Sequence, residues 1–234
     1  MFKGQFFKKK NQTTQRRKLI THSNPKSPIA EQFRNIRTNI EFASIDKKIR
    51  SLVVTSANPS EGKTVTTSNL AVVFAQQGKN VLLIDGDLRK PVLHQMLQVD
   101  NIFGLTNMLT HNQTLHECIH KTDIPHLDFI SCGTIPPNPA ELLSSNNMKN
   151  LLSQIYSIYD LVIFDLPPIL PVSDAQIMAN QCDASILVLR SSKTEKSAAL
   201  KAKKLLESAN GKLLGAVLND HGTTESAYYY YGEN

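Results

Sequence analysis

Residues 57–64, ANPSEGKT, match the phosphate-binding pattern G-x4-G-K-[ST] except at Ala57, which replaces the first glycine. The pattern lies between the apolar run SLVVTS and a helical stretch, as a phosphate loop requires. In such a loop Gly62 supplies backbone freedom, Lys63 reaches the β- and γ-phosphates and the Thr64 hydroxyl binds Mg2+. The helix that follows directs its positive N-terminus at the same anion. The sequence therefore predicts nucleotide binding by Ala57, Asn58, Pro59, Ser60, Glu61, Gly62, Lys63, Thr64 and Val65.

Three aspartates follow two other apolar runs. Asp85 and Asp87 follow NVLLI, and Asp165 follows LVIF. An aspartate at the end of an apolar strand is how phosphate-loop proteins hold their metal ion, commonly through water. Each aspartate taken singly also fits a turn or a helix cap. Because three carboxylates are more than one Mg2+ needs, we expect at least one of them to accept a proton.

The elements that must position these residues alternate along the chain. Six short, β-branched, apolar runs predict strands that are buried on both faces: SLVVTS, NVLLID, LDFISC, LVIFD, ASILVL and LLGAVLN. Helical stretches at 63–77, 139–157, 173–181 and 194–209 separate them. This alternation predicts an α/β fold with a doubly wound, mostly parallel sheet of the P-loop NTPase type. Ligands of such sheets bind beyond the carboxyl ends of the strands, where the loop and the aspartates are expected.

A further helix is expected to begin at SPIAEQFRNIRTNIEFA, where Ser27 can cap and Pro28 suits the first helical position. Its expected apolar stripe consists of Ile29, Phe33, Ile36 and Ile40. Glu31, Arg34 and Arg37 lie off that stripe at spacings of three, along one neighbouring face. An exposed Glu–Arg pair explains part of this pattern without any further role.

The length of 234 residues suits one sizeable domain, and the net charge of +6 is distributed unevenly. Residues 1–30 contain eight of the 26 Lys and Arg and no acid, so the remainder carries 18 basic and 20 acidic residues. We expect a basic arm at 1–26, a P-loop domain at 27–220 and a flexible tail at 221–234. The arm is either a disordered terminus or a tether to an anionic membrane surface or a membrane protein. Because the body shows no basic face, nucleic acid is not an expected partner.

Compartment is predicted from two further observations. No stretch approaches the roughly 18 apolar residues of a membrane-spanning helix, and no apolar signal core follows the N-terminal cations. Cys118, Cys132 and Cys182 have no metal-like or redox spacing, which is typical of reduced thiols in the cytosol.

The segments ANPSEGKT, VLLIDGDLRKP and LVIFDLPP closely resemble the Walker A, Walker A′ and Walker B motifs of the bacterial tyrosine kinases, the BY-kinase family. GTIPPNPAELLSS and the Glu31–Arg34–Arg37 spacing are also similar, and the likeness covers residues 27–234. The chain most resembles the separate cytoplasmic kinase subunit of Gram-positive capsule or exopolysaccharide systems, whose membrane-spanning activator is a different polypeptide.

The resemblance explains the end of the chain, where four of the six tyrosines stand in the last seven residues. It implies that the tyrosine cluster Tyr228, Tyr229, Tyr230 and Tyr231 accepts phosphate from ATP. It also implies that Lys63, Asp85, Asp87 and Asp165 are catalytic and that Thr64 and the three aspartates hold Mg2+. Asp85 is favoured over Asp87 as the base, although spacing does not separate them. Asn219, at the end of the last expected strand, is implied to bind the adenine edge.

The resemblance further implies assembly and regulation. Rings of subunits are expected to form through Glu31, Arg34 and Arg37, and each subunit offers its tail to the next. The implied partners are a transmembrane activator, protein tyrosine substrates and a cognate tyrosine phosphatase. The implied location is the cytoplasm, with recruitment to the inner face of the membrane.

Two other functions fit parts of the sequence. One is a P-loop ATPase of the septum-placement or plasmid-partition type, which typically has an additional lysine early in the loop. SANPSEG lacks that lysine, and the tyrosine cluster would have no role in such an ATPase. The other is a non-catalytic, nucleotide-sensing scaffold, against which the intact Lys63, Thr64 and aspartates argue. A tail that merely packs on the body is the alternative to a phosphate acceptor.

Overall fold

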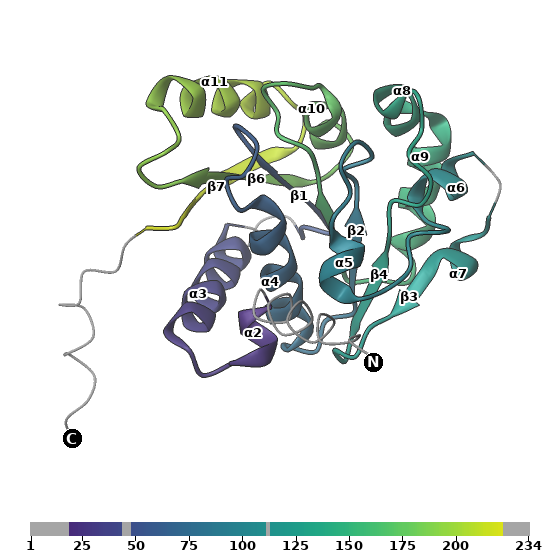
Figure 1. Ribbon diagram of the computed structural model, residues 1–234, viewed down its shortest axis with the longest axis horizontal. Helices are drawn as coiled ribbons and strands as arrows, with labels where there is room; N and C mark the ends of the chain where they lie inside the picture. The colour runs from purple at the N-terminus through teal and green to yellow at the C-terminus, as the bar shows by residue number, and fades with distance from the viewer. Residues whose placement is uncertain (1–18, 44–47, 111–112, 222–234) are drawn as a thin grey trace, which may run out of the picture.

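The computed structural model describes residues 19–43, 48–110 and 113–221. Most of the expected basic arm and all of the tyrosine cluster, Tyr228–Tyr231, therefore lie outside the described residues. In the described part, a central sheet is enclosed by helices on both faces (Figure 1).

The sheet has the strand order β3-β4-β2-β5-β1-β6-β7. Its parallel strands are β1 (Ser51–Ser56), β2 (Val81–Asp85), β4 (Leu127–Ile130), β5 (Leu161–Asp165), β6 (Ala184–Arg190) and β7 (Lys212–Asn219). All six correspond to the apolar runs, which confirms the expected fold class. Strand β3 (Ile119–Lys121) runs antiparallel to β4 at one edge and was not predicted. A strand of three residues is too short to produce a periodic pattern, and only its pairing with β4 defines it.

Two groups of helices cover the two faces of the sheet, and each group closes a separate apolar core (Figure 1). The first face carries α2 (Ile20–Ser23), α3 (Pro28–Phe42), α4 (Lys63–Ala75) and α5 (Leu93–Leu97). The second carries α6 (Leu105–Leu109), α7 (Leu115–Cys118), α8 (Pro139–Ser144), α9 (Asn146–Ile155), α10 (Asp174–Ala179) and α11 (Lys196–Glu207). Helices on both faces are what a doubly wound sheet requires, because its parallel strands are apolar on both sides.

The stretch 139–157, expected as one helix, is divided into α8 and α9. Ser145 separates them because its backbone is extended, with φ −66° and ψ 159°. The Ser145 hydroxyl accepts a hydrogen bond from the Met148 amide at 3.3 Å and so caps α9. A serine inside an apolar-periodic stretch is compatible with both arrangements, which is why the sequence pattern did not reveal the break.

Helix α2 lies inside the range that the sequence analysis assigned to the arm. Thr21 is buried, and its amide and hydroxyl donate hydrogen bonds to Asn69 Oδ1 at 3.0 and 2.8 Å. Gln76 Nε2 donates to the Thr21 carbonyl at 3.0 Å. These contacts attach residues 19–23 to α4, so the folded region begins before residue 27. A four-residue helix held by polar contacts has no apolar periodicity by which it could be predicted.

Helix α3 begins as expected, because the Ser27 hydroxyl accepts from the Ala30 amide at 3.1 Å and Pro28 is the first helical residue. Its buried face differs in one position from the expected stripe. Phe33 and Ile40 are buried, whereas Ile29 is 51% exposed and Ala30 is fully buried in its place. Residues 30, 33 and 40 share one helical face, and this face packs on α4.

Within the described residues, no helix is both long and apolar enough to cross a membrane.

Candidate active site

The phosphate loop connects β1 to α4 and contains two residues in the left-handed backbone region. Ser60 has φ 64°, and Gly62, which precedes the first helical residue Lys63, has φ 90°. A Cβ atom at position 62 would collide with the side chain of Asn219. The backbone angle therefore favours glycine at position 62, and a larger residue would also displace the Asn219 side chain.

Lys63, Thr64 and Asp165 form a tight cluster between the loop and the end of β5. The Lys63 ammonium lies 2.8 Å from Asp165 Oδ1, and the Thr64 hydroxyl donates to Asp165 Oδ2 at 2.6 Å. Thr67, one helical turn further along α4, donates to Asp165 Oδ1 at 2.9 Å. Thr67 was missed in the sequence, although its position three residues after Thr64 places it on the same helical face. Asp165 is fully buried, and these donors satisfy its charge.

Asp85 and Asp87 approach this cluster from the next strand. The pairing of β2 with β5 places Asp85 directly beside Asp165. Asp85 accepts hydrogen bonds from the Leu93 amide at 3.0 Å and from the Asp87 amide at 3.3 Å. Asp87 Oδ2 lies 3.8 Å from Lys63 Nζ. The structure thus brings together Lys63, Thr64 and all three predicted aspartates.

The environment makes Asp85 hard to ionise. Burial raises its pKa to about 8, the Asp165 carboxylate adds to the increase, and Lys63 opposes it. Burial likewise raises the pKa of Asp87, and Lys63 opposes that shift too. Asp85 is fully buried, whereas Asp87 is 7% exposed. A carboxyl group with a pKa close to the working pH is suited to accepting a proton from a substrate.

The donor set fits a nucleotide with Mg2+. Hydroxyl and carboxylate oxygens are the ligands that Mg2+ takes, and the ion commonly completes its shell with phosphate oxygens and water. Among the described residues, no three His, Cys, Asp or Glu side chains are placed to hold a metal ion by themselves. A Mg2+ ion here would therefore depend on the Thr64 hydroxyl and on the phosphates as well as on the acids.

Two further residues of the phosphate loop have side chains in the protein interior. Ala57 is fully buried, and Glu61 is 4% exposed. Glu61 Oε2 accepts from the Asn58 amide at 3.0 Å, and Glu61 Oε1 accepts from the Thr194 hydroxyl at 2.7 Å. The Glu61 side chain thus braces the loop from inside. Asn219 donates to the Glu61 carbonyl at 3.0 Å, so it lies against the loop as well.

Arg89 has a partner that the sequence analysis did not identify. Its Nε and Nη2 atoms donate to Asp174 at 2.8 and 2.9 Å, and the Asp174 carboxylate is fully buried. Asp174 begins α10, so this ion pair joins the segment after Asp87 to α10. In the sequence, Asp174 is recognisable only as an acidic residue of the kind that is common in the first turn of a helix.

The three residues expected to mediate oligomerisation have partners within the described part of the chain. Arg34 pairs with Glu31 at 2.7 Å and donates to the Pro25 carbonyl at 2.9 Å. Arg37 Nη1 donates to the Val73 carbonyl of α4 at 2.9 Å. These contacts fix the two arginines on the surface of α3, and a role in ring formation stays a prediction.

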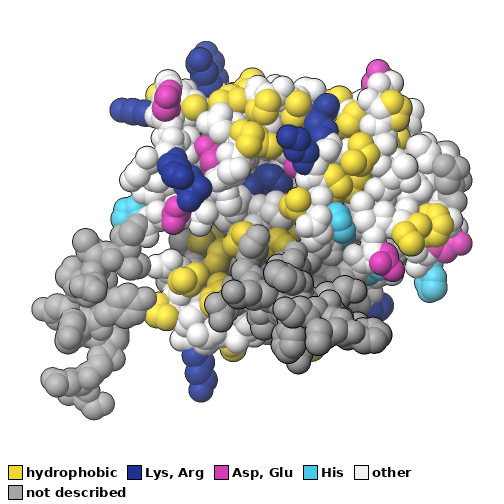
Figure 2. Space-filling model, viewed as in Figure 1, with side chains coloured by type: hydrophobic (Ala, Val, Ile, Leu, Met, Phe, Trp, Pro, Cys, Tyr) yellow, Lys and Arg dark blue, Asp and Glu magenta, His cyan; other side chains and the backbone are white. Residues whose placement is uncertain are grey.

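The space-filling view shows several Lys and Arg side chains in its upper half, around α11 and the centre of the molecule (Figure 2).

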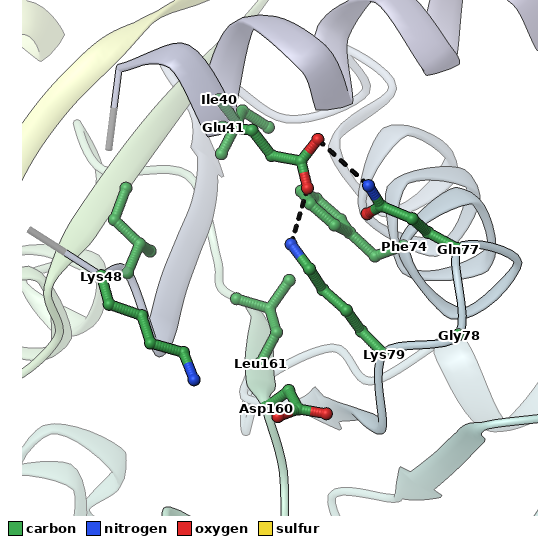
Figure 3. A pocket seen from close by; sticks show the side chains of 10 residues that line it. Ile40, Glu41, Lys48, Phe74, Gln77, Gly78, Lys79, Asp160 and Leu161 are labelled. Atoms are coloured by element: carbon green, nitrogen blue, oxygen red, sulfur yellow. Dashed lines mark hydrogen bonds and ion pairs between the residues drawn. The ribbon is translucent and has the colours of Figure 1, made fainter. Parts of the chain in front are cut away.

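A hollow of about 520 Å³ lies away from the candidate site, at the amino ends of the strands. Figure 3 shows Glu41 at its wall, where it pairs with Lys79 at 2.6 Å and accepts from Gln77 at 3.4 Å. None of the predicted site residues lines this hollow, so the carboxyl ends of the strands remain the candidate site.

The chain is similar to known proteins in both sequence and structure. Residues 49–207 match the AAA domain family. The chain is 52% identical over 217 residues to the tyrosine-protein kinase YwqD of Bacillus subtilis, and the alignment covers 92% of each protein. The crystal structure of the chimerical protein CapA2B2 superposes with a TM-score of 0.86 at 41% identity, over 88% of this chain and 91% of that one.

Two further structures separate the alternatives. The kinase domain of the Escherichia coli tyrosine kinase ETK has a TM-score of 0.84 at 36% identity, over 92% of this chain and 85% of that one. The septum site-determining protein MinD of Pyrococcus horikoshii has a TM-score of 0.64 at 24% identity, over 75% of this chain and 72% of that one, and so shares the fold alone. The chain therefore belongs to the bacterial tyrosine kinases, the BY-kinase family, and is an enzyme of the protein-tyrosine kinase class.

Proposed function

We propose that this kinase transfers the γ-phosphoryl group of ATP to its own tyrosine cluster, Tyr228–Tyr231, with Mg2+ as the metal. The observation that carries the proposal is the meeting of Lys63, Thr64 and Asp165 with Asp85 and Asp87 at the carboxyl ends of β2 and β5. A cation, a hydroxyl and buried carboxylates in one place provide what phosphoryl transfer needs, namely stabilised charge and a base.

Each residue has a distinct part in the transfer. Lys63 stabilises the negative charge that develops on the phosphates, and the amides of the loop do the same. Thr64 and Asp165 would hold Mg2+, which neutralises charge on the phosphate oxygens when it is bound. A carboxylate takes the proton of the tyrosine hydroxyl while the tyrosine oxygen bonds to the γ-phosphorus. The bond between that phosphorus and the bridging oxygen breaks, and ADP leaves. We assign the role of this base to Asp85, because its raised pKa suits a proton acceptor, and Asp87 is the alternative.

The length of the tail permits two arrangements of enzyme and substrate. The step from Asn219 to Tyr228 spans at most about 30 Å when extended, so a tail can reach its own site or that of a neighbour. We propose the neighbour, in a ring that Glu31, Arg34 and Arg37 hold together. Phosphorylation would crowd negative charge at the docked tail and so would favour disassembly. Light scattering before and after full phosphorylation tests this, and an unchanged assembly would contradict it.

The cellular role is proposed from the family. We infer regulation of capsule or exopolysaccharide synthesis, with a separate transmembrane activator that recruits the kinase to the inner face of the membrane. A cognate tyrosine phosphatase would reverse the modification, and other proteins would be phosphorylated on tyrosine. Asn219 would bind the adenine edge in addition to its contact with the loop.

Incubating the purified protein with Mg-ATP and locating phosphate by mass spectrometry tests the central proposal. We expect phosphate on Tyr228–Tyr231, and no phosphate either in Lys63→Met or in a variant with all four tyrosines changed to phenylalanine. Release of free phosphate with unmodified tyrosines would instead indicate an ATPase of the partition type. Absence of turnover, with or without an activator fragment, would indicate a scaffold.

A further inference from the structure

The phosphate loop is joined to the strand from which the tyrosine tail departs. Arg190, at the end of β6, donates through Nη1 to the Ser60 carbonyl at 3.3 Å. Asn219, at the end of β7, donates to the Glu61 carbonyl at 3.0 Å. The Ser191 amide in turn donates to the Asn219 carbonyl at 2.8 Å. The loop, the turn after β6 and the end of β7 therefore form one connected unit.

Arg190 makes a second contact, with the first residue after β7. Its Nε and Nη2 atoms both lie on Asp220 Oδ2, at 2.9 and 2.8 Å. The Arg190 side chain is 30% exposed and that of Asp220 is 58% exposed, so the pair is accessible to solvent. The Arg190 guanidinium thus contacts the phosphate loop through one nitrogen. Its two other nitrogens contact Asp220, the first residue after β7, which we call the root of the tail.

The backbone around Arg190 is held in uncommon conformations. Among the described residues, five that are not glycine have positive φ, and three of these lie in this unit: Ser60 at 64°, Ser192 at 58° and Asp220 at 57°. Such conformations cost free energy and persist only where surrounding contacts impose them. At Asp220 this conformation turns the chain as it leaves β7, and the Asp220 side chain is held there by its ion pair with Arg190.

We infer that Arg190, acting through Asp220, is a positioning residue for the phosphoryl acceptor: it fixes the direction in which the tail departs and so increases the rate of tail phosphorylation. This inference rests on the proposed function, because it concerns delivery of the same tyrosines. The Asp220 side chain pairs with Arg190, and Arg190 contacts the loop at the Ser60 carbonyl and not at Lys63 or Thr64. Loss of the ion pair should therefore leave the Lys63 cluster in place, and the affinity for ADP tests this.

The test is Asp220→Asn in the full chain, with Glu207→Gln as the matched control. Glu207 pairs with Lys203 on α11 at 3.2 Å, is similarly exposed and lies outside the unit. From the usual strength of exposed ion pairs, we expect Asp220→Asn to slow tail phosphorylation by about 2- to 5-fold. Glu207→Gln should phosphorylate its tail at the wild-type rate, and Asp220→Glu should be slower than the wild type but faster than Asp220→Asn. The difference in rate between Asp220→Asn and the wild type should become smaller at high salt, because salt screens the ion pair.

Two further measurements distinguish positioning from damage to the site. In a background with all four tail tyrosines changed to phenylalanine, Asp220→Asn should phosphorylate a synthetic peptide of residues 222–234 as fast as the unchanged background does. Its affinity for ADP should also be unchanged. A fall in the peptide rate equal to the fall in the tail rate overturns the inference, as does a tail rate that is unchanged or higher. A wild type that leaves its tail unmodified refutes the proposed function itself.

Discussion

Replacing Arg89 by methionine should destabilise the protein, because it removes both hydrogen bonds to a fully buried carboxylate. The Arg89–Asp174 distances are 2.8 and 2.9 Å, and the Asp174 side chain has no exposed surface. Methionine retains most of the aliphatic stem, so lost packing contributes little. The change therefore isolates the cost of leaving the Asp174 charge without its partner.

The magnitude lies between two limits. An exposed ion pair contributes about 0–1 kcal/mol, whereas removing one member of a buried pair costs about 3–5 kcal/mol. The Arg89 side chain is 38% exposed, which allows water to approach part of the pair. We therefore expect Arg89→Met to lower the free energy of unfolding by about 2–3 kcal/mol. The double variant Arg89→Met with Asp174→Asn should recover at least about half of that loss, because the buried charge is removed.

Urea denaturation at pH 7 measures these differences directly. Lys203→Met serves as the control, because Lys203 belongs to an exposed pair with Glu207, and we expect it to change stability by less than about 0.5 kcal/mol. Tail phosphorylation should also fall in Arg89→Met, since Arg89 anchors the segment whose amides bond to Asp87. A loss of stability no larger than that of the control would refute the reasoning, as would a double variant less stable than Arg89→Met.

Three further predictions concern the phosphate loop and its neighbours. Ser60→Gly should raise the free energy of unfolding by about 0.5–1 kcal/mol, because glycine adopts φ 64° without strain; thermal denaturation measures this, and a lower melting temperature would contradict it. Gly62→Ala should weaken ADP binding in a calorimetric titration, because alanine is strained at φ 90° and its methyl group displaces the Asn219 side chain that contacts the loop; binding at wild-type strength would contradict this. The fold raises the pKa of Asp85 from 3.8 to about 8 and so favours the protonated form. The contribution of Asp85 to the free energy of unfolding is therefore full below about pH 4 and is lost as the pH rises to about 8. In metal-free protein, the stability of Asp85→Asn relative to the wild type should therefore increase between pH 5 and 8, and a constant difference across that range would exclude the proposed shift.

The parts of the site that could be predicted from the sequence are those with a local pattern. ANPSEGKT determines its own loop, and each apolar run that ends in aspartate determines a strand end. Because parallel strands end at the same edge of a sheet, the fold class predicted Asp85 and Asp165 at one edge, and the pairing of β2 with β5 made them direct neighbours. The same reasoning did not find Thr67, Asp174 or Thr194, since their residue types and spacing are ordinary.

Local residue patterns were enough to predict the alternation of strands and helices, the phosphate loop and the acids, because these depend on residues close together in the chain. The partner of Arg89, the burial that raises the pKa of Asp85, and the contacts of Arg190 with both the loop and Asp220 depend on how distant segments meet in the fold. Ser60 and Asp220 are 160 positions apart in the numbering. The physical reason is that ion pairing and desolvation act over a few ångströms in space and leave no periodic trace along the chain.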